Sequence, residues 1–559
     1  MSQINPLDKN NNLPIKPLKL EEINEENADS IFLILDTDKN KHVSDEEIRA
    51  YGFVGEMFNK AKEKFIQLFG EYFVGDSKDE EGYFRYHNWK IETTVANKIE
   101  DIPTGSHDGV RDARRYDISR LNLSRKELLD LCIDKTTILS AEQKAIIDEV
   151  KEKAKDPGLG IRDLHKQGYT GKGVRMAIID QPIGRHKEYT SRIVKNIDIN
   201  TKDMEGWEQA SMHAAAVTSI AVGESVGVAP EADVEFYSAV NMSYNPKDIA
   251  EWKKKVYEEM KKDPYSKKWL LEDLKIYEEM GGCPSNKPYV EAINRILDNN
   301  ENAPDNEKVS VISISWGFDQ LASGYDDLLK AIDRAKKQGV FIVSTALIRD
   351  YGFNTNGANR NPDGDLNNPE NYEIGAFLKN RDNSYDDKLL LVPMDHRTVA
   401  DFTDGESYRY EGNDGGMSWS TPWLAGMYVL AKQADSNITP EKFWAIALTQ
   451  SDECNDNDTG KKIGRIINPQ KLIDEVVRLK DKKESIVLEE GSFDNEVFLQ
   501  SKEKDNKTVM KRKELTLTEQ EELKIKKFEE LANRYKSENL EYVIDINQNG
   551  IGHYKVQTK

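Results

Sequence analysis

The chain has 559 residues, of which 38% are hydrophobic and 32% are charged, and its formal net charge is −21. That length is too great for one ordinary hydrophobic core, so we expect two to four domains. The acidic balance argues against a nucleic-acid partner, because phosphate binding requires a basic face. It suits the attraction of cations such as calcium, or of basic peptides.

Two features bear on the compartment in which the protein works. The first ten residues, MSQINPLDKN, contain no basic segment followed by an apolar one, so no signal peptide is expected, and no apolar run is long enough to span a membrane. The cysteines Cys132, Cys283 and Cys454 are few and widely spaced, which indicates reduced thiols. These features predict a cytoplasmic protein, with export by another route left open.

The N-terminal part of the chain contains a candidate metal site. Residues 1–20 are polar and contain prolines, so we expect a disordered tail there. In the following segment, 21–75, two helical patterns flank a twelve-residue stretch with oxygen-bearing side chains at its first, third, fifth, ninth and twelfth positions. A loop with this spacing can wrap a hard cation, and the final glutamate can close the site with both oxygens.

The stretch resembles an EF-hand, and the resemblance implies calcium as the cofactor. The implied ligands are Asp36, Asp38, Asn40, His42, Ser44 and Glu47. Lys41 stands where such loops usually have glycine. The alternative is a solvated acidic helix–loop–helix without a bound ion.

The next two regions differ in their pattern of apolar and polar residues. Residues 76–157 mix helical stretches with aromatic-rich polar segments, so we expect a second domain or a packing collar of unknown role. From residue 158 onward, apolar runs alternate with helical patterns, which predicts an α/β fold with a mostly parallel sheet and helices on both faces. The expected strands cover 174–180, 234–240, 309–315 and 339–346. Residues 245–306 are predicted to be a helical insertion, and 350–371 a long loop.

Three polar residues occupy positions where α/β sheets place reactive groups. Asp180 ends an apolar strand pattern, His213 heads a helix of small residues, and Ser418 follows a glycine pair ahead of a buried helix predicted over 423–431. A serine at a helix start lies where unpaired N–H groups favour developing negative charge. Each residue alone also has an ordinary explanation, as a cap or as a core or surface histidine.

In combination, these residues resemble the subtilisin-like serine peptidases, whose catalytic residues follow the order Asp, His, Ser. Further segments that resemble the family's motifs are 168–180, 227–230, 315–317, 416–422 and 464–469. Together the segments cover about residues 160–480. The resemblance therefore implies a subtilisin-like peptidase domain over 158–482, followed by a charged region over 483–559.

The resemblance also implies a role for each residue. His213 would take the proton of Ser418, the serine oxygen would attack a peptide carbonyl, and Asp180 would orient the imidazole. An extended substrate strand would pair with Ser315, Trp316 and Gly317. The backbone amide of Ser418 would donate to the oxyanion.

The chain departs from the family pattern at several positions. Gln181 and Pro182 follow the aspartate where the family has other residues, and Leu347 or Ile348 stands where an asparagine completes the oxyanion hole. Losing that donor costs about 3–4 kcal/mol of transition-state stabilisation, unless another asparagine replaces it. The candidates for that replacement are Asn354, Asn356 and Asn359.

We therefore expect a divergent serine endopeptidase with a protein or peptide substrate, modulated by calcium. One alternative is an inactive pseudopeptidase that binds peptides or a partner and responds to calcium. A calcium-binding scaffold with an incidental likeness to the family is another.

Overall fold

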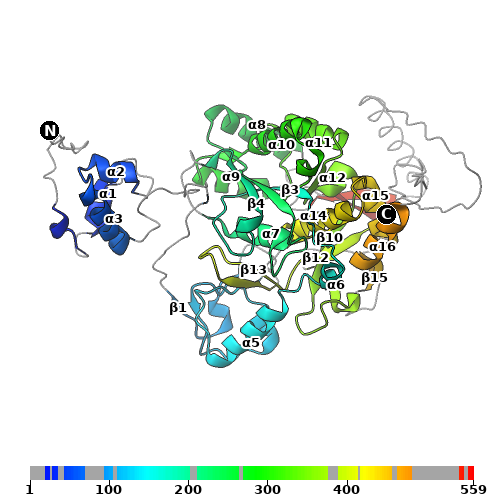
Figure 1. Cartoon of the computed structure of the whole chain (residues 1–559), viewed down its shortest axis with the longest axis horizontal. Coiled ribbons are helices and arrows are strands. Elements are labelled where there is room, and N and C mark those ends of the chain that lie inside the picture. The colour runs from blue at the N-terminus through cyan, green and yellow to red at the C-terminus, as the bar shows by residue number, and fades with distance from the viewer. Residues whose placement is uncertain are drawn as a thin grey trace, which may run out of the picture. The chain divides into compact units, whose positions relative to one another are not determined.

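The computed structural model describes most of the chain between residues 19 and 480, and a short part near the C-terminus (Figure 1). The described ranges are 19–24, 28–35, 43–69, 83, 93–104, 110–201, 210–262, 269–375, 388–412, 416–455, 462–480, 540–546 and 552–558. They fall into two compact units. The first comprises Met1–Asn241, Lys287–Trp316 and Asp326–Glu484, and the second comprises Met242–Asn286, Gly317–Tyr325 and Ser485–Lys559.

Short helices around a small hydrophobic cluster form the N-terminal part of the first unit. They are η1 (Leu20–Glu22), α1 (Ala28–Leu35), α2 (Asp45–Ala50) and α3 (Glu56–Phe69). Ile31, Val43 and Phe65 are buried in the cluster that these elements share. Helix α2 begins at a capping box, in which Ser44 and Glu47 each accept a hydrogen bond from the other's backbone amide.

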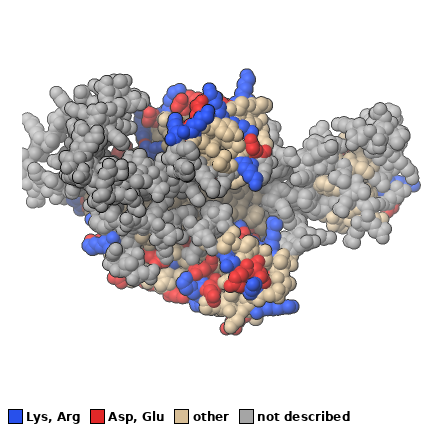
Figure 2. All heavy atoms as spheres, turned by 180° about the vertical axis from the view of Figure 1, so that it is seen from behind, with Lys and Arg blue, Asp and Glu red and all other residues tan. Residues whose placement is uncertain are grey.

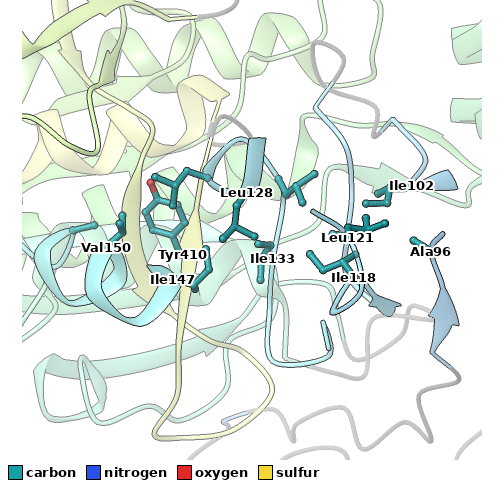
Figure 3. Close-up of a cluster of buried hydrophobic side chains, with 13 residues drawn as sticks. Ala96, Ile102, Ile118, Leu121, Leu128, Ile133, Ile147, Val150 and Tyr410 are labelled. Atoms are coloured by element: carbon teal, nitrogen blue, oxygen red, sulfur yellow. The ribbon is translucent and has the colours of Figure 1, made fainter. Parts of the chain in front are cut away.

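Residues 93–154 form a module of short elements, which we call the collar. Its elements are β1 (Thr94–Val95), η3 (Ile99–Asp101), β2 (Tyr116–Asp117), α4 (Arg125–Leu129) and α5 (Ala141–Lys153). The collar's buried side chains share one hydrophobic cluster with Tyr410, which belongs to a hairpin much later in the chain and lies near Leu128 and Ile147 (Figure 3). The collar therefore completes its hydrophobic core with a side chain from the α/β part of the unit.

A five-stranded sheet forms the centre of the first unit, in the order β4-β5-β3-β8-β9, with every neighbouring pair parallel. The strands are β3 (Arg175–Asp180), β4 (Ile193–Asp198), β5 (Asp233–Ser238), β8 (Val309–Ile314) and β9 (Phe341–Ser344). Strands β3 and β8 are buried over most of their length, as expected for parallel strands covered by helices on both faces. The predicted α/β fold is confirmed.

Helices and short helical turns precede, connect or follow these strands. They are α6 (Ile161–Lys166), η4 (Thr190–Arg192), α7 (Met212–Val222), α10 (Lys287–Asn302), η6 (Asp305–Glu307), α11 (Tyr325–Lys337) and α12 (Leu347–Tyr351). Helix α7 is buried from Ala214 to its end, because its small side chains allow it to pack closely. It contacts β3, the β13–β14 hairpin described below, and helix α14 (Gly416–Ala434) (Figure 1).

A second sheet in the same unit has the order β11-β10-β12-β16-β15. Its strands are β10 (Thr355–Arg360), β11 (Tyr372–Ile374), β12 (Leu390–Pro393), β15 (Asp452–Asn455) and β16 (Lys462–Ile466). The remaining elements of the unit are η7 (Pro369–Asn371), the hairpin of β13 (Arg397–Ala400) and β14 (Tyr408–Glu411), and helices α15 (Pro440–Thr449) and α16 (Pro469–Lys480).

The prediction of one long loop over 350–371 is wrong, because β10 lies within it. The sequence of β10, TNGANR, is too polar to indicate a buried strand. Its backbone nevertheless pairs with β11 on one side and with β12 on the other. Hydrogen bonding to two neighbours thus overrides the weak strand preference of these residues.

The second unit contains β6 (Met242–Ser243), α8 (Pro246–Lys262), α9 (Trp269–Glu279), β7 (Cys283–Pro284), β17 (Leu540–Ile546) and β18 (Gly552–Thr558). Trp252 and Val256 of α8 pack with Leu270 and Leu274 of α9 in a small buried cluster. Helices are present in the predicted insertion over 245–306, although α10 belongs to the first unit.

The surface carries charges of both signs. On the face displayed in Figure 2, basic and acidic side chains of the described residues are interspersed. None of the helices in the described ranges is long and apolar enough to cross a membrane. The three cysteines, Cys132, Cys283 and Cys454, are buried.

Candidate active site

Asp180 and His213 form a hydrogen-bonded pair between the central sheet and α7. Asp180 is the last residue of β3, and His213 lies in the first turn of α7. Nδ1 of His213 lies 2.8 Å from Oδ1 of Asp180. Since a carboxylate can only accept, Nδ1 carries the hydrogen, and Nε2 of the neutral ring keeps its lone pair. The pair therefore presents a base through Nε2.

The start of α7 is held against the end of β3 by Ser211, Gln181 and Pro182. Ser211 caps the helix by accepting a hydrogen bond from the amide of His213 at 3.1 Å. The Ser211 hydroxyl donates to the side-chain oxygen of Gln181, and its amide donates to the carbonyl of Pro182 at 2.7 Å. The residues that follow Asp180 thus fix the helix that carries the histidine.

The pKa of His213 is set by opposing effects. Burial lowers it, but the charge of Asp180 and the hydrogen bond to it raise it, and the net result lies above the ordinary value of 6.5. Asp180 is 6% exposed, whereas the His213 side chain is 24% exposed. A buried carboxylate beside a partly exposed imidazole stabilises the protonated ring, which a general base needs after it has taken a proton.

Ser418 and Ser315 exchange hydrogen bonds between α14 and the end of β8. Oγ of Ser315 donates to the carbonyl of Ser418 at 2.8 Å, and Oγ of Ser418 donates to the carbonyl of Ser315 at 3.4 Å. Within the described part of the chain, the Ser418 hydroxyl has no hydrogen bond to the His213 ring. Its bond to Ser315 is long and therefore weak, so the hydroxyl can turn to another acceptor at little cost.

Trp419 brings the imidazole and the serine helix together. Its ring centroid lies 5.3 Å from that of His213, with 34° between the ring planes. Because Trp419 directly follows Ser418, this contact places the histidine next to the start of α14, in agreement with the packing of α14 on α7. Sequence reasoning did not select Trp419, since a tryptophan in an apolar helix normally indicates core packing.

Asp180, His213 and the Ser315 region lie in a segment with a family match. Residues 171–347 match the model of the subtilase family. The predicted resemblance is thereby confirmed for this segment, while Ser418 lies beyond it. No curated protein matches the chain.

Solved structures of subtilisin-like proteins resemble this chain at low sequence identity. The prenylagaramide maturation protease PagA is 15% identical, with a TM-score of 0.36, 57% of this chain covered and 98% of that chain. A cold-adapted subtilisin-like serine proteinase is 17% identical, with a TM-score of 0.34 and coverages of 53% and 89%. The A-subunit of the AB5 toxin from E. coli is 11% identical, with a TM-score of 0.37 and coverages of 57% and 98%.

Helix α14, which carries Ser418, starts earlier than predicted. It begins at Gly416 rather than at Trp423, so that Pro422 lies inside it. Proline has no N–H, and it therefore cannot donate to the carbonyl four residues before it, which is that of Ser418. The Ser315 hydroxyl donates to this carbonyl instead. The proline thus leaves an acceptor available where the helix start joins the end of β8.

The other expected substrate-binding residues of the subtilase segment follow β8. Trp316 is 39% exposed, and its carbonyl accepts a hydrogen bond from the amide of Thr345 at 3.3 Å. Gly317 follows it directly in the sequence and belongs to the second unit. Trp316 therefore offers an open aromatic surface beside the strand end that carries Ser315.

The oxyanion-hole asparagine of subtilases has no direct counterpart at the end of β9. Leu347 is buried and Ile348 is 40% exposed, both in α12, and neither has a side-chain donor. Asn356 and Asn359, two of the three possible replacements, lie in β10, and Oδ1 of Asn356 accepts from the amide of Gly357 at 2.8 Å. Asn354 precedes that strand.

Only part of the predicted calcium site can be placed. Asp36, Asp38, Asn40 and His42 lie outside the described residues. The two remaining candidates bond to each other, since Oε2 of Glu47 accepts from the amide and the hydroxyl of Ser44 at 2.9 and 3.0 Å. In the described ranges, no group of three or more His, Cys, Asp or Glu side chains is arranged to hold a metal ion.

Proposed function

We propose that this protein is a serine endopeptidase in which Asp180, His213 and Ser418 act as a catalytic triad. The main support is the 2.8 Å hydrogen bond between Asp180 and His213, beside a helix whose first turn carries Ser418. The subtilase match over residues 171–347 supports the same reaction class. The alternative of an inactive, peptide-binding relative is tested by the same experiment.

In the proposed reaction, the Ser418 hydroxyl leaves the carbonyl of Ser315 and donates to Nε2 of His213. The serine oxygen attacks the substrate carbonyl as His213 takes the proton, and an acyl-enzyme forms when the protonated ring gives that proton to the departing amine. Water then releases the acyl group by the same route. Asp180 keeps the ring in the required tautomer and stabilises its charged form.

Two backbone features of the same site suit peptide substrates. The Ser418 amide lies in the first turn of α14, where N–H groups without helical partners can donate to an oxyanion. The residues after β8 can pair with a substrate strand, and the exposed indole of Trp316 can contact one of its side chains.

A fluorophosphonate probe tests this proposal, because it reacts with a serine only where a base activates the hydroxyl. We expect the native protein to be labelled at Ser418, as read by peptide mass spectrometry, and heat-denatured protein to remain unlabelled. The variant Ser420→Ala, which changes a buried serine of the same helix, should be labelled as the native protein is. Absence of labelling, or labelling at another residue, would overturn the proposal in favour of a binding protein.

We further propose that calcium binds the segment from Asp36 to Glu47. Ser44 and Glu47 supply oxygen atoms at the loop's end, and their mutual hydrogen bonds orient the carboxylate there. Carboxylate and hydroxyl oxygens are the ligands that this hard cation prefers, so the donor set fits. The cysteines of the sequence are few and buried, which suits a reducing compartment, and we propose the cytoplasm.

Isothermal titration of the full chain with calcium tests this site. We expect one binding event that Glu47→Gln weakens by about tenfold or more, since losing one charged ligand costs roughly 1.5–3 kcal/mol. Glu63→Gln, at an exposed position of α3, is the matched control and should bind as the native protein does. Equal affinity in Glu47→Gln and the native protein would show that the ion does not bind at this loop.

A further inference from the structure

The tryptophan that follows the proposed nucleophile is buried. Trp419 is 2% exposed, and no described residue accepts a hydrogen bond from its Nε1–H. A buried donor without an acceptor destabilises a fold. The orientation of this ring is therefore set by its packing, and its neighbours include the imidazole of His213.

The geometry of the two rings suits a cation on the histidine. An aromatic face attracts a cation that lies within about 6 Å of the ring centroid. The 5.3 Å between the centroids of Trp419 and His213 meets this distance condition, and the two ring planes are 34° apart. Indole is the most effective of the aromatic side chains in this interaction.

Other charged groups also act on this imidazole. Asp180 on β3 accepts from its Nδ1. Arg409 and Glu411 on β14 form a buried ion pair with each other, and their effects on the histidine have opposite signs. The charged form of the ring therefore depends mainly on Asp180 at one nitrogen and on the aromatic face beside it.

We propose that Trp419 is a positioning residue that holds the His213 ring in place and stabilises its protonated form through a cation–π contact. This inference rests on the proposed function for its role in catalysis, because in the proposed reaction His213 becomes positively charged when it takes the proton of Ser418. The test of this inference does not need catalysis, since the His213 ring can also be protonated by lowering the pH.

The test compares Trp419→Leu with Trp419→Phe. The first removes the aromatic face and keeps an apolar side chain, and the second keeps an aromatic ring. NMR of protein with labelled histidines gives the titration of His213, whose signal is identified by its loss in His213→Gln. We expect Trp419→Leu to lower the association constant of the neutral His213 imidazole for a proton by about 3- to 30-fold. Trp419→Phe should lower this constant less.

Kinetics give a second measurement. If the protein hydrolyses peptides, Trp419→Leu should reduce kcat by a similar factor and leave KM nearly unchanged, because the contact strengthens only when the ring is charged. Trp444→Phe, which alters a buried indole stacked on Phe353, is the control and should leave the His213 titration unchanged. An unaltered His213 titration in a folded Trp419→Leu protein would overturn the inference. Failure of fluorophosphonate labelling would instead overturn only the proposed function.

Discussion

Ser418→Ala should eliminate peptide hydrolysis while leaving the fold intact. Without the hydroxyl there is no nucleophile for the substrate carbonyl, and removing the serine from a triad of this kind lowers kcat by a factor on the order of 10⁶. The stability should change little, since in the described part of the chain Oγ of Ser418 makes a single long hydrogen bond, at 3.4 Å, to the carbonyl of Ser315. Cleavage of a mixed peptide pool and thermal unfolding measure the two effects.

The matched control is Ser420→Ala in the same helix. Its hydroxyl donates to the carbonyl of Met417 at 3.1 Å, so the substitution removes a comparable group two residues from the nucleophile. This variant should retain most of the activity. An equal loss of cleavage activity in both variants would indicate that the substitutions damage α14. Full activity in Ser418→Ala would exclude this serine as the nucleophile.

Asp180→Asn should slow the reaction by about 10⁴-fold, provided that the triad works as proposed. An amide can donate to Nδ1 of His213, which would place the hydrogen on Nε2 and remove the lone pair that accepts the serine proton. The 2.8 Å contact would survive with its polarity reversed. The kcat of the variant, compared with that of Asp163→Asn on the exposed face of α6, isolates this effect.

The pH profile gives the second signature of this substitution. Activity requires neutral His213, so the native rate should increase as pH increases through the raised pKa of that group, above 6.5. With the charge of Asp180 removed, burial dominates and the pKa falls, which moves the increase to lower pH. The ion pair also stabilises the native fold below about pH 6.5, and that contribution disappears as pH rises through the folded-state pKa. An unchanged profile in Asp180→Asn would contradict the pairing.

The sequence predicted four of the five strands of the central sheet, because they contain short apolar runs. Asp180 and His213 were found for the same reason, since both stand where an apolar pattern ends or a helix of small residues begins. Strand β4 was not predicted, since its sequence, IVKNID, mixes apolar and polar residues and is only partly buried. Strand β10 was missed because its polar residues are held by pairing with β11 and β12, which local pattern does not reveal.

The details around Ser418 also required three-dimensional information. A proline normally marks the start of a helix, so Pro422 indicated a start near Trp423 rather than at Gly416. The Ser315 hydroxyl, more than a hundred residues away in the sequence, fills the place of the missing N–H donor. The contact between Trp419 and His213 likewise joins two helices that no sequence pattern relates.

The shared core of the collar limits how this chain can be processed. Tyr410 of β14 packs among collar side chains such as Leu128 (Figure 3), and the amide of Thr398 on β13 donates to the carbonyl of Ala154 at 3.1 Å. Proteolysis that removed residues 93–154 would expose the Tyr410 side chain and the Thr398 amide to water. Cleavage there would therefore cost the β13–β14 hairpin part of its burial and one of its backbone hydrogen bonds.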